Sequence, residues 1–259
     1  MRLDLKLQGL DSVRESLSRL SGKQARTAYA DALNDTGFMV RRAMRDEIRN
    51  VFDRPTPYVV NSVFVRKATA DKLGVAIEPT YYGGKGIDPQ QILQAQEFGG
   101  TRRDKRSEVA LRRAGILPAG FQTAIPRMPY PGSDDGRGNL RGAFLVQLIS
   151  YFQAFGEQGY RANMTARRRA TVHRGTAKQA GRRYFVAYGR LRSGATAHLA
   201  PGIWAASGTH GSVLQPVVMF VRGGVYRSRL SMDAIAQKAG ADAYLQRRLR
   251  FRIRQAAGE

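Results

Sequence analysis

Apolar side chains at helical spacing dominate the first fifty residues. Four leucine or valine residues from Leu10 to Leu20 form one stripe, which predicts a short helix closed at Ser21-Gly22. A longer stripe from Tyr29 to Ile48 predicts a second helix over about 23–51. Such a helix spans about 40 Å. Two interpretations stay open, because it could be a core helix with a solvated basic face or could also pack against a neighbouring subunit.

The second helix is predicted to end where the sequence reads FDRPTPYVVNSVFVRKAT, over 52–69. Pro55 and Pro57 lack the backbone N–H that a continuing helix needs, and each disfavours the helical conformation of the residue before it. Apolar and polar residues then alternate over 61–68, as in a half-buried strand. The stretches SVFVRKA and KLGVAIE are predicted to pair as a hairpin.

The pattern is less regular from residue 79 onward. Asp88-Pro89 begins a predicted helix that ends at Gly99-Gly100. Residues 100–139 are dense in charge and then rich in proline and glycine, which predicts an extended arm or loop ordered mainly by partners.

Regular elements return at Leu140, where an apolar stripe predicts a helix that stops at Gly156. YFVAYGR and PVVMFVR are predicted strands, and the second is nearly all apolar, as expected of a central strand. Ser231 is predicted to cap one final helix.

These elements predict an α+β fold, in which a long N-terminal helix packs on a small, mostly antiparallel β-sheet, with an extended insertion and a C-terminal helix. We expect three segments: 1–99 with the N-terminal helices and hairpin, 100–139 as the arm, and 140–259 with a helix, strands and the basic C-terminal helix. The first and third are expected to form one composite domain.

The net charge of the chain adds an expectation about its partners. The chain has 43 Lys or Arg and 20 Asp or Glu residues, so its formal net charge is +23. Such an excess favours a polyanionic neighbour: nucleic acid, an anionic membrane or an acidic protein assembly. No apolar run reaches about 18 residues, so no membrane span is expected. The opening MRLDLKLQGLDS has charges where a signal peptide needs an apolar stretch, so export is not expected.

The positive charge is concentrated in two places. Residues 161–183 contain eight Arg or Lys and no acid. Five arginines crowd the last turns of the C-terminal helix: Arg247, Arg248, Arg250, Arg252 and Arg254. Cations near a helix C-terminus are favoured by the helix dipole, but five exceed what capping requires.

The search for catalytic chemistry gives no enzyme signature. The absence of cysteine excludes disulfides, thiolate catalysis and cysteine-based zinc sites. His173 lies in the arginine run and is expected to be solvated or to face a phosphate, whereas His198 is expected to be structural and His210 lacks a catalytic-triad context. GGKG at 83–86 and Asp134-Asp135-Gly136 are expected to be turns. We therefore expect no catalytic residue, no cofactor and no metal.

Several stretches resemble the minor tail and tail-completion proteins of tailed bacteriophages, the relatives of minor tail protein Z. These are ADALNDTGFMVRRAMRDEI with the proline corner after it, GGTRRDKRSEVALRRAGILPAGF, NLRGAFLVQLISYFQAFGEQGYRANMTARRRA and HLAPGIWAASGTHGSVLQPVVMFVRGGVYRSRL. The resemblance covers most of the chain in order and includes no catalytic motif. The sequence departs from it at 125–139.

The resemblance implies a structural virion protein made in the host cytoplasm, forming a homo-oligomeric ring at the head–tail junction or head-proximal tail end. Its implied partners are copies of itself, neighbouring neck, portal-adaptor, tail-terminator or tail-tube proteins, and packaged double-stranded DNA. It implies no membrane and no small-molecule substrate. The proline corner would fix the angle between a helix that packs on a neighbour and a small sheet that faces the bore or the next ring.

On this basis we expect two sets of functional arginines. Those expected to face DNA or the bore are Arg167, Arg168, Arg169, Arg174, Arg182 and Arg183. Those expected at subunit or partner interfaces are Arg41, Arg45, Arg247 and Arg248, with the rest of the 247–254 cluster. A cytoplasmic nucleic-acid-binding protein that uses 161–183 for phosphate contacts remains the main alternative. An enzyme of phage assembly or lysis is the least favoured, since no acid pair or nucleophile constellation is present.

Overall fold

The computed structural model describes residues 21–80, 88–177 and 179–258, and their contacts divide the chain into two compact units. The helical unit comprises the described parts of 1–102 and 225–259, and the sheet unit comprises 103–224. The expected helix before Ser21 and the expected turn at 83–86 lie outside the described residues. The predicted division at 99 and 139 differs from these units, because the chain enters the sheet unit at 103 and returns to the helical unit at 225.

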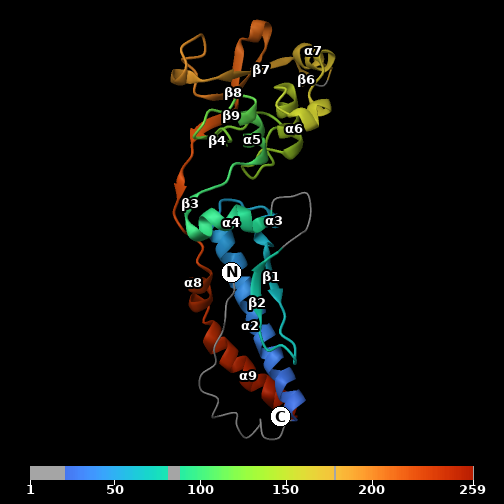
Figure 1. The fold of residues 1–259 in the computed structure, drawn as a ribbon, viewed down its shortest axis with the longest axis vertical. Helices are drawn as coiled ribbons and strands as arrows, with labels where there is room; N and C mark the ends of the chain where they lie inside the picture. Colours follow the sequence, from blue (N-terminus) through green and yellow to red (C-terminus); the bar gives the residue numbers. More distant parts are fainter. Residues whose placement is uncertain (1–20, 81–87, 178, 259) are drawn as a thin grey trace. The chain divides into compact units, whose positions relative to one another are not determined.

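The helical unit is built around one long helix (Figure 1). Its elements in chain order are α2 (Gly22–Val51), α3 (Pro57–Val60), β1 (Val63–Arg66), β2 (Ala76–Pro79), α4 (Pro89–Phe98), β3 (Gly100–Thr101), β10 (Val225–Tyr226), α8 (Met232–Lys238) and α9 (Ala241–Ala257). β1 pairs with β2 and β3 with β10, both antiparallel. The predicted α+β fold, with its long N-terminal helix and small antiparallel sheets, is confirmed.

Helix α2 begins and ends where its sequence dictates. The Ser21 hydroxyl accepts a hydrogen bond from the Gln24 N–H at 3.2 Å, and the Gln24 side chain accepts one from the Ser21 N–H at 2.9 Å. This reciprocal cap satisfies two N–H groups at the helix start. At the other end Phe52 is extended, and Pro57 begins the short α3 behind the cap residue Thr56. The predicted proline corner is therefore confirmed.

Helix α2 packs against other elements of the helical unit along its whole length. Its first half contributes Ala28, Ala32 and Leu33 to a core shared with α9, and its second half contributes Met44 and Ile48 to a core shared with β1, β2, α4 and α8. The interpretation of α2 as a core helix thus accounts for its length. Packing against a neighbouring subunit is not needed to explain it.

An ion-pair cluster joins α2 to α9, which lies beside it (Figure 1). Asp35 Oδ2 accepts a hydrogen bond from Arg248 Nε at 2.9 Å and from Arg252 Nε at 2.9 Å. Arg252 Nη2 donates to Asp35 Oδ1 at 3.0 Å. Burial alone would raise the pKa of Asp35, but the hydrogen bonds and charges of Arg252 and Arg248 outweigh it and hold that pKa below its ordinary value.

The predicted single C-terminal helix is wrong in one respect, because α8 and α9 are separate. Ser231 caps α8, as expected, through a hydrogen bond to its hydroxyl from the Ala234 N–H. Gly240 then adopts a left-handed conformation with φ of 66°, which ends the first helix and starts the second. The break lets Ile235 and Ala236 pack on the second half of α2, while Leu245 and Leu249 pack on its first half.

The sheet unit packs helices on a four-stranded antiparallel sheet. Its elements are α5 (Arg106–Arg113), β4 (Phe121–Ala124), α6 (Gly142–Tyr151), η2 (Glu157–Ala162), α7 (Ala166–Arg174), β5 (Gly175–Thr176), β6 (Gln179–Ala180), β7 (Arg182–Ala187), η3 (Gly189–Leu191), β8 (Gly202–Ser207), η4 (Thr209–Gly211) and β9 (Val213–Arg222). The strand order is β4-β9-β8-β7. The central position predicted for PVVMFVR is confirmed by β9, and β8 was not predicted as a strand.

Residues 100–139 have more regular structure than the predicted arm. Glu108 of α5 is fully buried and accepts hydrogen bonds from the Lys105 N–H, the Thr123 N–H and the Thr123 hydroxyl, at 2.7, 2.7 and 2.8 Å. These bonds attach α5 to β4, and Leu111 and Leu117 enter the core of the sheet unit. The prediction of an arm relied on the density of proline and glycine. It did not foresee that the buried Glu108 carboxylate accepts hydrogen bonds from backbone N–H groups that have no local partner.

We predict that Asp35→Asn lowers the free energy of unfolding by about 2 kcal/mol at pH 7, because two half-buried arginines lose their shared carboxylate. The wild-type contribution is present above the ordinary aspartate pKa of about 3.9 and is lost as pH falls through the lowered folded-state pKa. Urea melts at several pH values measure both effects. Asp46→Asn, which removes an exposed pair with Arg49 on the same helix, is the control and should change stability by less than about 0.5 kcal/mol.

A second prediction concerns the attachment of α5. Glu108→Ala should cost about 3 kcal/mol, because it leaves three donors without their acceptor inside the protein. Glu108→Gln, which keeps an acceptor oxygen, should cost less. Limited proteolysis should spare 106–124 in the wild-type chain and cut it in the alanine variant. Early cleavage there in the wild-type chain would contradict the packed arrangement.

Candidate anion-binding site

The positive charge is unevenly divided between the two units. The sheet unit has nineteen Lys or Arg and five Asp or Glu residues, a formal net charge of +14. Among its acids whose side chains are described, Asp104 pairs with Arg112, Glu108 is buried in its hydrogen bonds, and Asp134 and Asp135 accept backbone N–H groups of their own turn. These carboxylates bond to other groups, and none of them forms an ion pair with an arginine of α7.

Helix α7 carries the largest group of arginines in the sheet unit. Thr165 caps it by accepting from the Arg168 N–H at 3.3 Å, and Arg167, Arg168 and Arg169 fill the first turn without an acid. The N-terminus of a helix is its positive end, so three cations there repel it. No residue of α7 is fully buried, and Val172 is the apolar side chain that packs on the core.

A glycine-bounded hairpin returns the chain from α7 to the sheet. Gly175 ends α7 with φ of 84°, β5 pairs with β6, and Gly181 precedes β7. A Cβ atom at Gly175 would meet the Gly181 backbone, and one at Gly181 would meet the His173 carbonyl. This close approach holds α7 against β7, so arginines eight or more residues apart in sequence lie on neighbouring elements.

His173 is half-buried beside this hairpin. Its Nε2 lies 2.8 Å from the Tyr151 hydroxyl, which also accepts the Tyr184 N–H at 3.2 Å. Burial lowers the pKa of His173, and the charges of Arg183 and Arg169 lower it further. A neutral His173 that accepts the Tyr151 proton fits both observations. His173 was expected to be solvated or to face a phosphate; its ring is half-buried, with Nε2 bonded to Tyr151 of the core, and most of the arginines around it are exposed.

Five of the six arginines expected to face DNA lie on α7 or on the neighbouring strand β7, and we refer to them together as the α7 surface: Arg167, Arg168, Arg169, Arg174 and Arg183. Arg167, Arg168, Arg174 and Arg183 are exposed and Arg169 is half-buried. Among the residues that the structure describes, none of the five has a carboxylate within ion-pair distance. The α7 surface is thus a concentration of uncompensated charge, which an anion would relieve.

Arg182 does not belong to this group. Consecutive residues of a strand point to opposite faces, so Arg182 and Arg183 diverge. Arg182 Nε donates to the Tyr184 hydroxyl at 2.7 Å and its Nη2 donates to Gln179 Oε1 at 3.1 Å. Burial raises the pKa of Tyr184, an effect that Arg182 offsets in part, so this hydroxyl is neutral at physiological pH.

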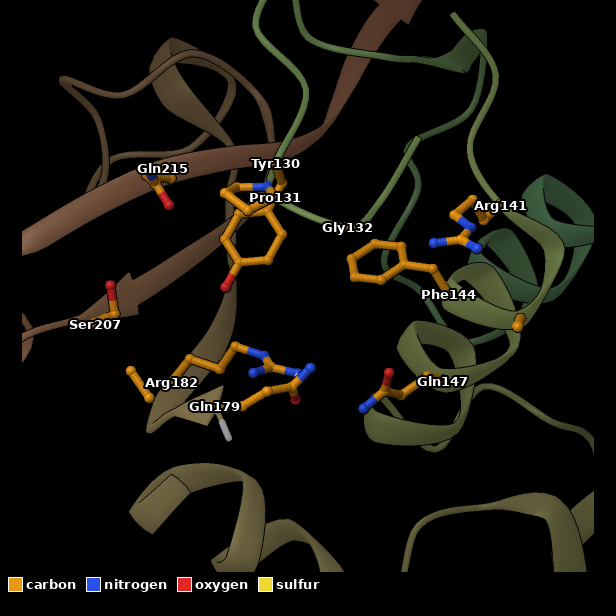
Figure 2. Close-up of a pocket in the computed structure, with 12 residues that line it drawn as sticks. Tyr130, Pro131, Gly132, Arg141, Phe144, Gln147, Gln179, Arg182, Ser207 and Gln215 are labelled. Atoms are coloured by element: carbon orange, nitrogen blue, oxygen red, sulfur yellow. The ribbon is translucent and has the colours of Figure 1, made fainter. Parts of the chain in front are cut away.

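Arg182 lines a pocket of about 620 Å³ in the sheet unit (Figure 2). The Tyr130 and Phe144 rings point into it, with centroids 6.1 Å apart. The other polar lining residues are Arg141, Gln147, Gln179, Ser207 and Gln215. We refer to it as the aromatic pocket. Tyr130, Arg141 and Gln147 were not recognised from the sequence, since they come from a loop and a helix that have no local motif.

Of the arginines expected at interfaces, some contact the rest of the helical unit and others are exposed. Arg41 Nε donates to the Val63 carbonyl at 2.8 Å and so attaches α2 to β1, and Arg45 is half-buried with its Nε enclosed. Arg248 is engaged with Asp35. Arg247, beside the Tyr244 ring, and Arg250 and Arg254 are exposed. These last three are the arginines of α9 available to a partner.

The described residues were also considered as a metal site and as a membrane span, and they fit neither. They contain no cluster of three or more His, Asp or Glu side chains arranged to hold a metal ion. None of the helices in the described ranges is long and apolar enough to cross a membrane. Comparison with known protein families, with curated sequences and with solved structures gives no match. Support for a function therefore comes from the geometry of the site and from the residues that carry the sequence resemblance.

We predict that NMR titration of the full chain gives His173 a pKa below the ordinary value of about 6.5. Its contribution to stability should be lost as pH falls from about 6.5 through the lowered value, because the unfolded chain binds the proton first. Arg183→Gln should raise the His173 pKa, whereas Arg190→Gln, at an exposed position outside this group, should not. A His173 pKa at or above the ordinary value would contradict its partial burial.

Proposed function

We propose that this chain is a structural virion protein of a tailed bacteriophage, a neck or tail-completion protein that assembles as a homo-oligomeric ring. The observation that supports it best is the α7 surface, where five arginines have no carboxylate partner among the described residues. Repeated around a ring, such a surface would present closely spaced cations to double-stranded DNA passing from head to tail. The sequence resemblance to tail-completion proteins supports the same proposal.

The two sets of exposed arginines have different roles in this proposal. The α7 surface contacts packaged DNA. Arg247, Arg250 and Arg254 of α9 dock on acidic surfaces of the neighbouring neck, portal-adaptor, tail-terminator or tail-tube proteins, because a guanidinium makes bidentate pairs with carboxylates. Arg41 and Arg248 support the fold of the helical unit and the Arg45 Nε is enclosed, so these three are poor choices for testing an interface.

The α7 surface also fits a nucleic-acid-binding protein that acts in the host cytoplasm outside any particle. Phosphate contacts supply the same sequence-independent affinity in both cases. The two functions differ in where the protein is found. A virion component is present in purified particles at a fixed copy number, whereas a cytoplasmic binder is absent from them.

The test uses a phage that encodes the chain. Removing the gene should yield heads and tails that fail to join, seen by electron microscopy. Replacing Arg167, Arg168 and Arg169 with Gln should leave joined particles that release DNA at lower temperature, because phosphate contacts that retain the genome are lost. Replacing Arg247, Arg250 and Arg254 removes the same charge and should instead reduce tail joining.

Three results would contradict the proposal. Complete infectious particles without the gene, or purified particles that lack the protein, would exclude a structural role. Exchanged phenotypes of the two triple variants would reject the assignment of the arginines. Circular dichroism melts of each variant serve as the control for folding.

A further inference from the structure

The aromatic pocket contains two cations and no acid among its lining residues. Arg141, at the start of α6, has no side-chain hydrogen bond or ion pair within the described chain. Arg182 uses two of its five N–H donors, on Tyr184 and Gln179, which leaves three for a ligand. Two cations without an acid make the electrostatic potential of this partly enclosed space positive, which favours an anionic ligand.

The rest of the lining is unsuited to a simple anion. Tyr130 and Phe144 present ring surfaces, while Gln147, Gln179 and Gln215 provide amides that both donate and accept hydrogen bonds (Figure 2). A carboxylate or phosphate alone needs donors only. The lining instead matches a ligand with an anionic group, a flat apolar part and mixed donors and acceptors along its edge.

The volume points to the same class of ligand. About 620 Å³ is far larger than one phosphate group and lies within the range of pockets for small organic ligands, about 300–1,000 Å³. Bases stack on aromatic side chains without regard to sequence, and glutamine amides can pair with base edges.

We propose that the aromatic pocket binds a nucleotide unit, with its phosphate on Arg141 and its base against Tyr130 and Phe144. The nucleotide is either free or part of a single-stranded nucleic acid, since both offer the same groups. This site differs from the α7 surface, which contacts only backbone phosphates. It also does not depend on the proposed place in a virion.

The pocket and the α7 surface are linked through a short segment of chain. Gln179 belongs to the β5–β6 hairpin that follows α7, and Arg182 is the first residue of β7. A strand end held by phosphate contacts along α7 would therefore have its terminal nucleotide close to the pocket. This favours a strand over a free nucleotide as the source, and the experiment separates the two.

Isothermal titration of the full-length protein tests the proposal with three probes: the four deoxynucleoside monophosphates, a ten-residue oligothymidylate and ribose 5-phosphate. Nucleotides should bind more tightly than ribose 5-phosphate, because only they carry a base. Arg141→Gln should weaken nucleotide binding roughly tenfold through loss of a charged hydrogen bond. Gln147→Leu should weaken it less and change the preference among the four bases.

Two control variants remove charge elsewhere in the sheet unit. Arg190→Gln should leave binding of the monophosphates unchanged, and so should the triple replacement of Arg167, Arg168 and Arg169, which weakens duplex binding instead. Binding of the oligothymidylate alone, sensitive to Arg141→Gln, supports the site and identifies a strand as its source. Binding of monophosphates as well supports the site for free nucleotides.

Four results would overturn the proposal. These are binding of ribose 5-phosphate as tight as that of the nucleotides, a loss of binding in Arg190→Gln as large as in Arg141→Gln, no binding of any probe, and binding of a glutamate-rich peptide in their place. A melting temperature unchanged by Arg141→Gln ensures that a lost signal reports the site rather than the fold.

Discussion

The shortage of carboxylates in residues 103–224 is the constraint on which the surface chemistry of this protein depends. Nineteen basic residues share this segment with five acids, and the acids with described side chains are engaged in a turn, a buried hydrogen-bond network or the pair with Arg112. The exposed arginines of α7 therefore repel one another, and the first turn repels the helix dipole as well. Selection for stability alone would place an acid there. The proposed contact of the α7 surface with a polyanion would account for the missing acid.

The helical unit shows how the same residue type behaves when its charge is compensated. Asp35 binds Arg248 and Arg252 across α2 and α9, two segments separated by more than two hundred residues. These arginines are half-buried and fixed by geometry, whereas Arg247, Arg250 and Arg254 of the same helix are exposed. The arginines on the face of α9 toward α2 therefore stabilise the fold. Those on its solvent face are available to a partner.

Periodic patterns predicted the elements of this fold well, because each depends on its own sequence: α2, the proline corner, the strand at Val63–Arg66 and the cap at Ser231 are all encoded locally. Contacts between distant residues escaped prediction. Glu108 joins α5 to β4 through partners fifteen residues away, which made an ordered segment resemble an arm. Likewise, Arg182 appeared to belong with the α7 arginines until strand alternation placed it in the aromatic pocket, together with residues from a loop and another helix.

The salt dependence of duplex DNA binding tests most directly whether the α7 surface contacts a polyanion. Each phosphate contact adds about −0.9 to the slope of log affinity against log salt concentration. Replacing Arg167, Arg168 and Arg169 with Gln should therefore reduce the magnitude of the slope by roughly 2.7, if each makes one contact. The triple replacement of Arg247, Arg250 and Arg254 changes net charge equally and should leave the slope nearly unchanged. Equal slopes for the α7 variant and the wild-type chain, or the same reduction from both variants, would contradict the assignment of DNA contact to α7.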